Sequence, residues 1–121
     1  MDLMHSIRKL AERRGVFRPD AYFLVLEALE IAMESMEVRG HISGEDLLDW
    51  IRELGRERYG VMAGDVFNAW GVHATIDFGR IVVHLVEAGL LRKREDDSLT
   101  DFIDKFDFQD AFALKVFEGR A

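Results

Sequence analysis

The chain has 121 residues, of which 49% are hydrophobic and 32% charged, a balance typical of one globular domain rather than of disorder. It has no cysteine, which excludes disulfides and zinc–thiolate sites. Met1-Asp2 opens the chain, and no apolar run long enough for a signal peptide or a membrane span follows. We therefore expect a soluble, cytoplasmic protein with a single domain over residues 1–121.

The formal net charge is −7, with 23 acidic against 16 basic residues. Proteins that bind nucleic acid usually carry a basic excess, because phosphate contacts supply much of their affinity. The charge is also uneven, since residues 1–18 hold five basic against two acidic residues, and residues 95–110 hold seven acidic against one basic. This pattern suggests pairing between the two ends of the chain, or a charged partner.

Apolar residues recur at helical spacing in the first third of the chain. Residues 2–14 predict an amphipathic helix that Gly15 ends, and Pro19 suits the first turn of the next helix. The second helix is predicted from Asp20 to Glu37. Its expected core seam has 4-3-4-3 spacing and consists of Tyr22, Leu26, Leu29, Met33 and Met36.

The middle of the chain predicts three further helices. Ser43 can cap a helix that runs to Arg58, and a short helix should cover residues 62–69. Thr75 can cap the last helix, over residues 76–88, with Gly89 as its left-handed cap. The residues expected on the buried faces are Leu47, Ile51, Leu54, Ile81, Val82, Leu85 and Val86.

The pattern changes after Gly89. Leu90 begins a basic strand, residues 95–98 form a polar turn, and a second strand can return by Ile103, so a β-hairpin is predicted over residues 90–103. Residues 104–121 are rich in phenylalanine and are expected to pack back on the core or on a partner. The expected fold is mainly α with a small β-hairpin.

Residues 81–97 (IVVHLVEAGLLRKREDD) resemble the passage from recognition helix to wing in winged helix-turn-helix domains. Such domains place a short strand before their second helix, and His41-Ile42-Ser43 could supply it. The resemblance implies a winged-helix-like unit over residues 41–103. A helical pair over residues 1–40 precedes this unit, and the aromatic tail follows it.

A longer set of short motifs resembles a family of small bacterial single-domain proteins that is designated by a locus tag. These motifs are Pro19-Asp20-Ala21-Tyr22-Phe23, His41-Ile42-Ser43-Gly44, Trp70-Gly71-Val72, Asp77-Phe78-Gly79, Leu85-Val86-Glu87-Ala88-Gly89-Leu90-Leu91 and Phe106-Asp107-Phe108. The resemblance implies a bacterial source and one fixed domain, and it brings no activity and no catalytic residue.

Binding of nucleic acid by the wing would depend on a small set of cations. Those residues are Arg80, Arg92, Lys93 and Arg94. Asp77 and Glu87 lie on the predicted recognition helix, and acidic residues follow the wing directly. The negative charge of these carboxylates would nearly cancel the positive charge that a phosphate needs for binding. Protein contacts are therefore the favoured use of this unit, and a nucleic-acid-binding transcriptional regulator is the alternative.

A stripe of glutamates runs beside the predicted seam of the second helix: Glu27, Glu30, Glu34 and Glu37. Helical bundles that bind two metal ions normally add Glu-x-x-His pairs, and none occurs here. We expect the stripe to be solvated or paired with Arg8, Arg13 and Arg14. With Phe106 and Phe108 it forms the predicted interaction surface.

No catalytic, cofactor-binding or metal-binding motif is predicted. The histidines are scattered, and Ser43 lacks the turn of a nucleophile and is already explained as a helix cap. The sequence therefore favours a non-enzymatic protein–protein interaction or regulatory module that forms a homodimer. The second alternative is a small enzyme whose active site cannot be identified from the sequence.

Overall fold

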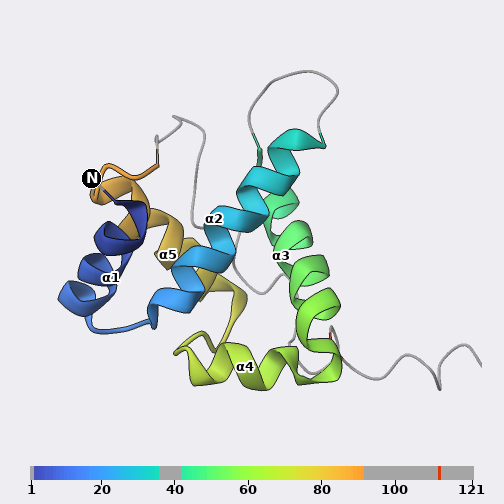
Figure 1. The fold of residues 1–121 in the computed structure, drawn as a ribbon. Helices are drawn as coiled ribbons and strands as arrows, with labels where there is room; N and C mark the ends of the chain where they lie inside the picture. Colours follow the sequence, from blue (N-terminus) through green and yellow to red (C-terminus); the bar gives the residue numbers. More distant parts are fainter. Residues whose placement is uncertain (1, 36–41, 92–111, 113–121) are drawn as a thin grey trace, which may run out of the picture.

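The structure is a computed structural model that describes residues 2–35, 42–91 and 112 (Figure 1). This described part contains five α-helices and one short 3-10 helix, and it contains no strand. The predicted helical class is therefore confirmed. The predicted hairpin falls almost entirely outside the described residues. Leu90 and Leu91, its first two positions, form no strand, and neither do Ile42 and Ser43.

None of the helices in residues 2–35 and 42–91 has the length and apolar character needed to cross a bilayer.

Helix α1 (Leu3–Arg14) begins at Asp2, whose carboxylate accepts the backbone N–H of Met4 at 3.1 Å. It ends where predicted, at Gly15, whose φ of 68° is a conformation that glycine adopts without a Cβ penalty. Leu3, in the first turn of α1, is 50% exposed. The body of the protein covers α1 only from its second turn onward, where the buried residues are Ile7, Leu10 and Ala11.

Helix α2 (Pro19–Glu34) starts with the predicted proline, but its buried face matches the predicted seam only in part. Its buried residues are Ala21, Tyr22, Leu24, Val25, Ala28 and Ala32. Leu26 and Leu29 are only partly buried, and Met33 is 53% exposed. The seam was therefore correct only in part: Tyr22 is buried, and Leu26 and Leu29 pack against the core without being fully covered. Because α2 is apolar on most sides, periodicity alone does not select a face. Met36 lies outside the described residues. The alanines let neighbouring helices approach closely, and the core lies on their side.

Helix α3 (Gly44–Tyr59) leads through a 3-10 turn, η1 (Gly60–Met62), into helix α4 (Ala63–Ala69). The predicted cap is confirmed, since the Ser43 hydroxyl accepts the N–H of Asp46 at 3.1 Å. The predicted inner face of α3 is buried as well. Its Gly55 lies so close to α4 that an added Cβ would be 2.8 Å from the ring of Phe67.

Helix α5 (Thr75–Glu87) is capped differently from the prediction. Asp77 reaches back and accepts the N–H groups of His73 and Ala74, at 2.8 and 3.2 Å. The N-cap position is Ala74, and Thr75, which was predicted there, is the first residue of the helix. Gly89 has the predicted left-handed conformation, with φ of 77°, after the helix has ended.

The loop before α2 and the turn after α4 cross closely. The N–H of Arg18 donates to the carbonyl of Trp70 at 3.0 Å. Gly71 has φ of 92°, and a Cβ there would lie 2.6 Å from the carbonyl oxygen of Val16. This crossing fixes where α2 starts relative to α5, because Gly71 lies between α4 and α5.

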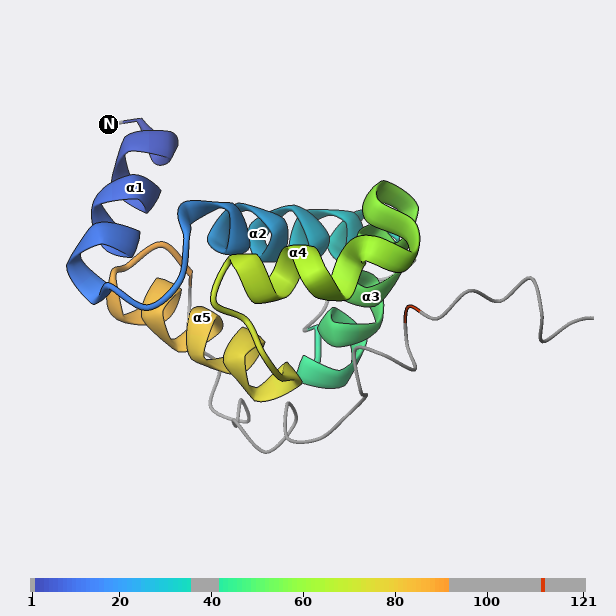
Figure 2. The ribbon, with the colours of Figure 1, turned by 90° about the horizontal axis from the view of Figure 1, so that it is seen from below.

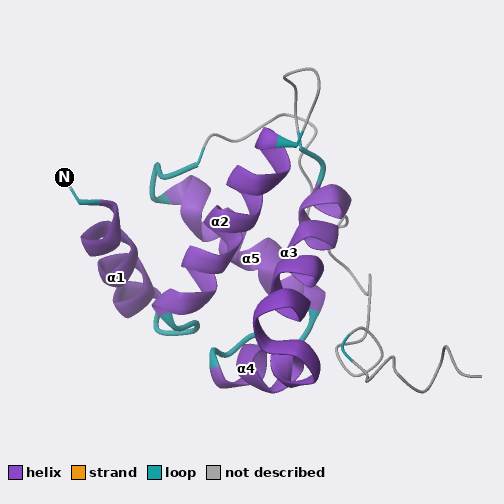
Figure 3. Ribbon diagram, turned by 45° about the vertical axis from the view of Figure 1, so that its right-hand side comes forward, coloured by secondary structure: helices purple, strands orange, loops and turns teal. Residues whose placement is uncertain are grey.

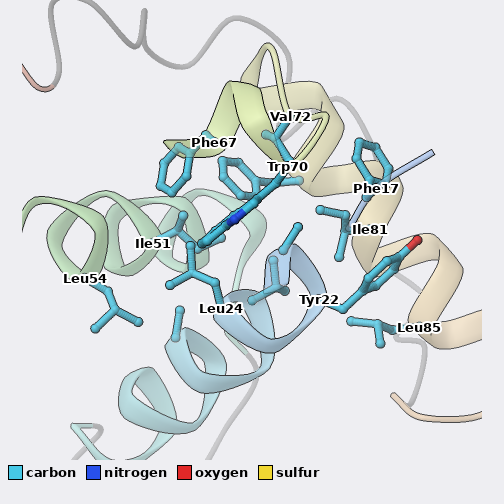
Figure 4. Close-up of a cluster of buried hydrophobic side chains, with 14 of the residues drawn as sticks. Phe17, Tyr22, Leu24, Ile51, Leu54, Phe67, Trp70, Val72, Ile81 and Leu85 are labelled. Atoms are coloured by element: carbon cyan, nitrogen blue, oxygen red, sulfur yellow. The ribbon is translucent and has the colours of Figure 1, made fainter. Parts of the chain in front are cut away.

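Helix α2 is central and contacts α1, α3 and α5 (Figures 1 and 3). Helix α1 stands at one end of the molecule, with its first turn projecting past α2 (Figure 2). The core joins aromatic residues around α4 to aliphatic residues of α2, α3 and α5 (Figure 4). Phe112 is the described residue of the aromatic tail. It is buried, with its ring centroid 5.5 Å from that of Phe67.

Candidate functional site

A polar cluster lies where α1, α2 and α5 meet. The hydroxyl of Tyr22 and Nδ1 of His84 are hydrogen-bonded at 2.8 Å, which joins α2 to α5 across 62 positions of sequence. Beside them, Arg14 at the end of α1 forms an ion pair with Glu87 at the end of α5, at 2.5 Å. We call these four residues the junction cluster. It connects three helices whose other contacts are mostly apolar.

The rings around the junction cluster hold its geometry. Phe17, in the loop between α1 and α2, is buried and packs edge-on against Tyr22, with ring centroids 6.2 Å apart. Its ring is also 5.8 Å from that of His84. Figure 4 shows the Tyr22 side chain reaching from α2 towards α5, beside Leu85. The imidazole is thus fixed by apolar rings as well as by its hydrogen bond.

Burial shifts both titratable partners of this bond towards their neutral forms. It raises the pKa of Tyr22, although the positive charge of Arg14 acts in the opposite direction. Burial is also the main cause that lowers the pKa of His84, and Arg14 lowers it further. An uncharged imidazole with its proton on Nε2 can accept the Tyr22 O–H at Nδ1. At neutral pH the pair is therefore a neutral hydrogen bond.

The hydrogen bond and the ion pair of the junction cluster are made between helices. A general acid or base must lie within hydrogen-bonding reach of a substrate. Tyr22 is 0% exposed, and its hydroxyl is already bonded to His84. The neighbouring charges of Arg14 and Glu87 neutralise each other. This pairing could not be read from the sequence, where Tyr22 was expected only in the core seam of the second helix and His84 was one of several scattered histidines.

The glutamate stripe was expected to be solvated or paired with the arginines of α1. Glu30 and Glu34 are exposed, which agrees with a solvated stripe. The ion pair of Glu27 is instead with Arg58 of α3, and Arg14 of α1 pairs with Glu87 of α5. Glu37 lies outside the described residues.

Arg80 is the only one of the four predicted phosphate-contacting cations in the described part of the chain. Its guanidinium is 2.6 Å from the carboxylate of Asp77, which also caps α5. A phosphate would have to compete with that carboxylate for the same guanidinium. Arg92, Lys93, Arg94, Phe106 and Phe108 lie outside the described residues.

Among the residues that the structure describes, no three His, Cys, Asp or Glu side chains are grouped to hold a metal ion. His73 is engaged locally, with Nδ1 2.6 Å from the side-chain oxygen of Asn68. The geometry thus provides an internal junction, an exposed acidic and apolar side of α2, and a separately exposed α1. Compared with known protein families, curated proteins and solved structures, the chain matches none.

Proposed function

We propose that the chain is a non-enzymatic protein–protein interaction module that works in the cytoplasm and binds through the outer sides of its helices. One observation carries this proposal. The central helix α2 exposes Met33, whose side chain is 53% exposed, next to Leu26 and Leu29, which pack against the core and are only partly buried. Exposed glutamates, Glu30 and Glu34, lie beside them. An apolar strip with a charged rim is typical of a docking surface.

The position of α2 strengthens this argument. A helix in the centre of a small domain normally has its apolar side chains covered by its neighbours. Here α1, α3 and α5 pack on the alanine side and leave the methionine side outward. Methionine is flexible and polarisable, so it adapts well to a partner surface. The partner that we propose first is a second copy of the chain.

The winged-helix arrangement belongs to the same proposal. Helix α5 ends at Glu87 and Gly89 turns the chain, as a helix leading into a wing requires. Its polar side chains are used internally, since Arg80 pairs with Asp77 and Glu87 with Arg14. The net charge of −7 also favours a protein partner over nucleic acid for such a unit.

Sedimentation velocity of the purified full-length chain over a hundredfold range of micromolar concentrations tests the proposal. We expect a species of about twice the monomer mass of 13.9 kDa that dissociates on dilution. Met33→Asp should shift this equilibrium towards monomer, because it places a charge on the exposed apolar strip. Val61→Asp, at a valine that is 50% exposed near α4, is the matched control.

A monomer at every concentration would refute self-association. Fluorescence anisotropy with genomic duplex fragments then tests the alternative. A nanomolar complex that weakens steeply with salt would favour the nucleic-acid-binding regulator.

A further inference from the structure

We propose that the outer face of α1 docks on the outer face of α2 in a second copy of the chain, and that this contact occurs twice about a two-fold axis. The inference rests on the proposed function and names the surfaces that would meet. This contact is favoured because the exposed faces of α1 and α2 carry opposite charges, and because each has apolar side chains beside its charged ones. The two faces do not pair with each other within one chain.

The α1 face is basic. Arg8, Lys9 and Arg13 are exposed, and none of them forms an ion pair with any residue in the described part of the chain. Glu12 is the one acidic residue of α1. Met4 is one helical turn before Arg8 and is 50% exposed, so a flexible apolar side chain lies beside the cations.

The position of α1 leaves this face open. Its buried stripe fixes the helix from Ile7 onward, and its first turn projects past α2 at the end of the molecule (Figure 2). Within the described part of the chain these cations are exposed and form no ion pair with α2. In a protein of net charge −7, such an unpaired basic face is a local exception.

The α2 face is acidic. Leu26, Glu30 and Met33 follow one another at spacings of four and three, and Glu34 is one turn after Glu30. Neither Glu30 nor Glu34 pairs with a cation within residues 2–35 and 42–91, whereas Glu27 is held by Arg58. The face thus offers two free carboxylates beside Leu26 and Met33.

The two faces complement each other in charge and in apolar content. Cations on α1 would meet carboxylates on α2, and Met4 would meet Leu26 and Met33. A two-fold axis repeats the contact, because α1 of each copy then packs on α2 of the other copy. Within one chain the two faces do not pair: α1 contacts α2 and buries Ile7, Leu10 and Ala11, whereas the cations of α1 and the carboxylates of Glu30 and Glu34 are exposed.

Charge-swap variants of the full-length chain test the pairing. One variant, Arg8→Glu with Lys9→Glu, makes both faces acidic, and the other, Glu30→Lys with Glu34→Lys, makes both faces basic. Each alone should weaken self-association about tenfold to a hundredfold, because like charges then oppose each other at both contacts. An equimolar mixture of the two should restore a dimer, since each acidic α1 now meets a basic α2 and each basic α1 an acidic α2.

Sedimentation velocity measures all of these species, and circular dichroism confirms that each variant is folded. The control is Glu45→Lys with Glu57→Lys, two exposed glutamates of α3, which change the net charge as much as the α2 variant does and should leave the dimer intact. A chain carrying all four swaps on α1 and α2 should dimerise like the natural chain.

Two results would overturn the pairing. In the first, the natural chain dimerises and both swap variants dimerise equally well. The proposed function then stands, with a different surface. In the second, each variant is monomeric and the mixture stays monomeric, so the faces do not recognise each other. A natural chain that is always monomeric would overturn the proposed self-association itself.

Discussion

The hydrogen bond between Tyr22 and His84 gives the sharpest test of how this fold is held together. Tyr22→Phe removes the hydroxyl that is 2.8 Å from Nδ1 and leaves the ring in its place. A neutral hydrogen bond contributes about 0.5–1.5 kcal/mol net, and a stranded buried acceptor costs more. His84 is only partly buried, so water can reach it. We therefore expect the variant to lose about 1–1.5 kcal/mol of unfolding free energy.

The other tyrosine of the chain is a matched control. Tyr59 is partly exposed and packs edge-on against Trp70, with ring centroids 5.9 Å apart. Its hydroxyl forms no hydrogen bond with a described residue. Tyr59→Phe should therefore change the unfolding free energy by no more than about 0.5 kcal/mol.

Urea denaturation followed by the helical circular dichroism signal measures both variants. A double-mutant cycle with His84→Leu then isolates the pair, with an expected coupling of about 1 kcal/mol. Equal effects of the two tyrosine variants, or no coupling to His84, would show that the junction cluster contributes no specific stability.

Three further predictions follow from other features. Gly71→Ala should destabilise by about 2–5 kcal/mol, because it combines a left-handed backbone with a clash against the carbonyl of Val16. Gly15→Ala, which has open space around it, should cost only about 1–2 kcal/mol, and similar urea midpoints for the two variants would contradict the close crossing. Asp77→Ala should cost about 1–2 kcal/mol through loss of the α5 cap, whereas an unchanged thermal midpoint would argue against that cap. The lowered pKa of His84 means that the unfolded chain binds its proton at higher pH than the folded chain. Stability should therefore decline as pH falls below the ordinary histidine pKa of about 6.5, and the decline should be shallower in His84→Gln.

Much of the local structure could be predicted from the sequence. Gly15, Ser43 and Gly89 mark helix boundaries because a left-handed residue or a side-chain cap acts within one turn of its own position. Pro19 marks the start of α2 for the same local reason. The buried side of α3 was also correct, since that helix has one apolar stripe between polar residues.

The candidate surfaces could be predicted less well. The solvated character of Glu30 and Glu34 was anticipated, but the partner of Glu27 was not, because Arg58 comes from a position 31 residues away. The basic residues of α1 were recognised as a charge cluster, and the glutamates were one of the partners considered for it. Only the placement of α1 at the end of the molecule shows that Arg8 and Lys9 remain exposed.

Composition and short-range pattern thus determined that this protein is helical, where most of its described helices begin and end, and how its charge is distributed. The exception is α2, which ends at Glu34 rather than at the predicted Glu37. The tertiary structure decided which side of α2 is covered, because a helix that is apolar on most sides has no preferred face until its neighbours pack on the alanines. It also decided that Tyr22 meets His84 and that Arg14 meets Glu87. Those pairings depend on the positions of three helices in space, and no periodicity along one helix encodes such positions.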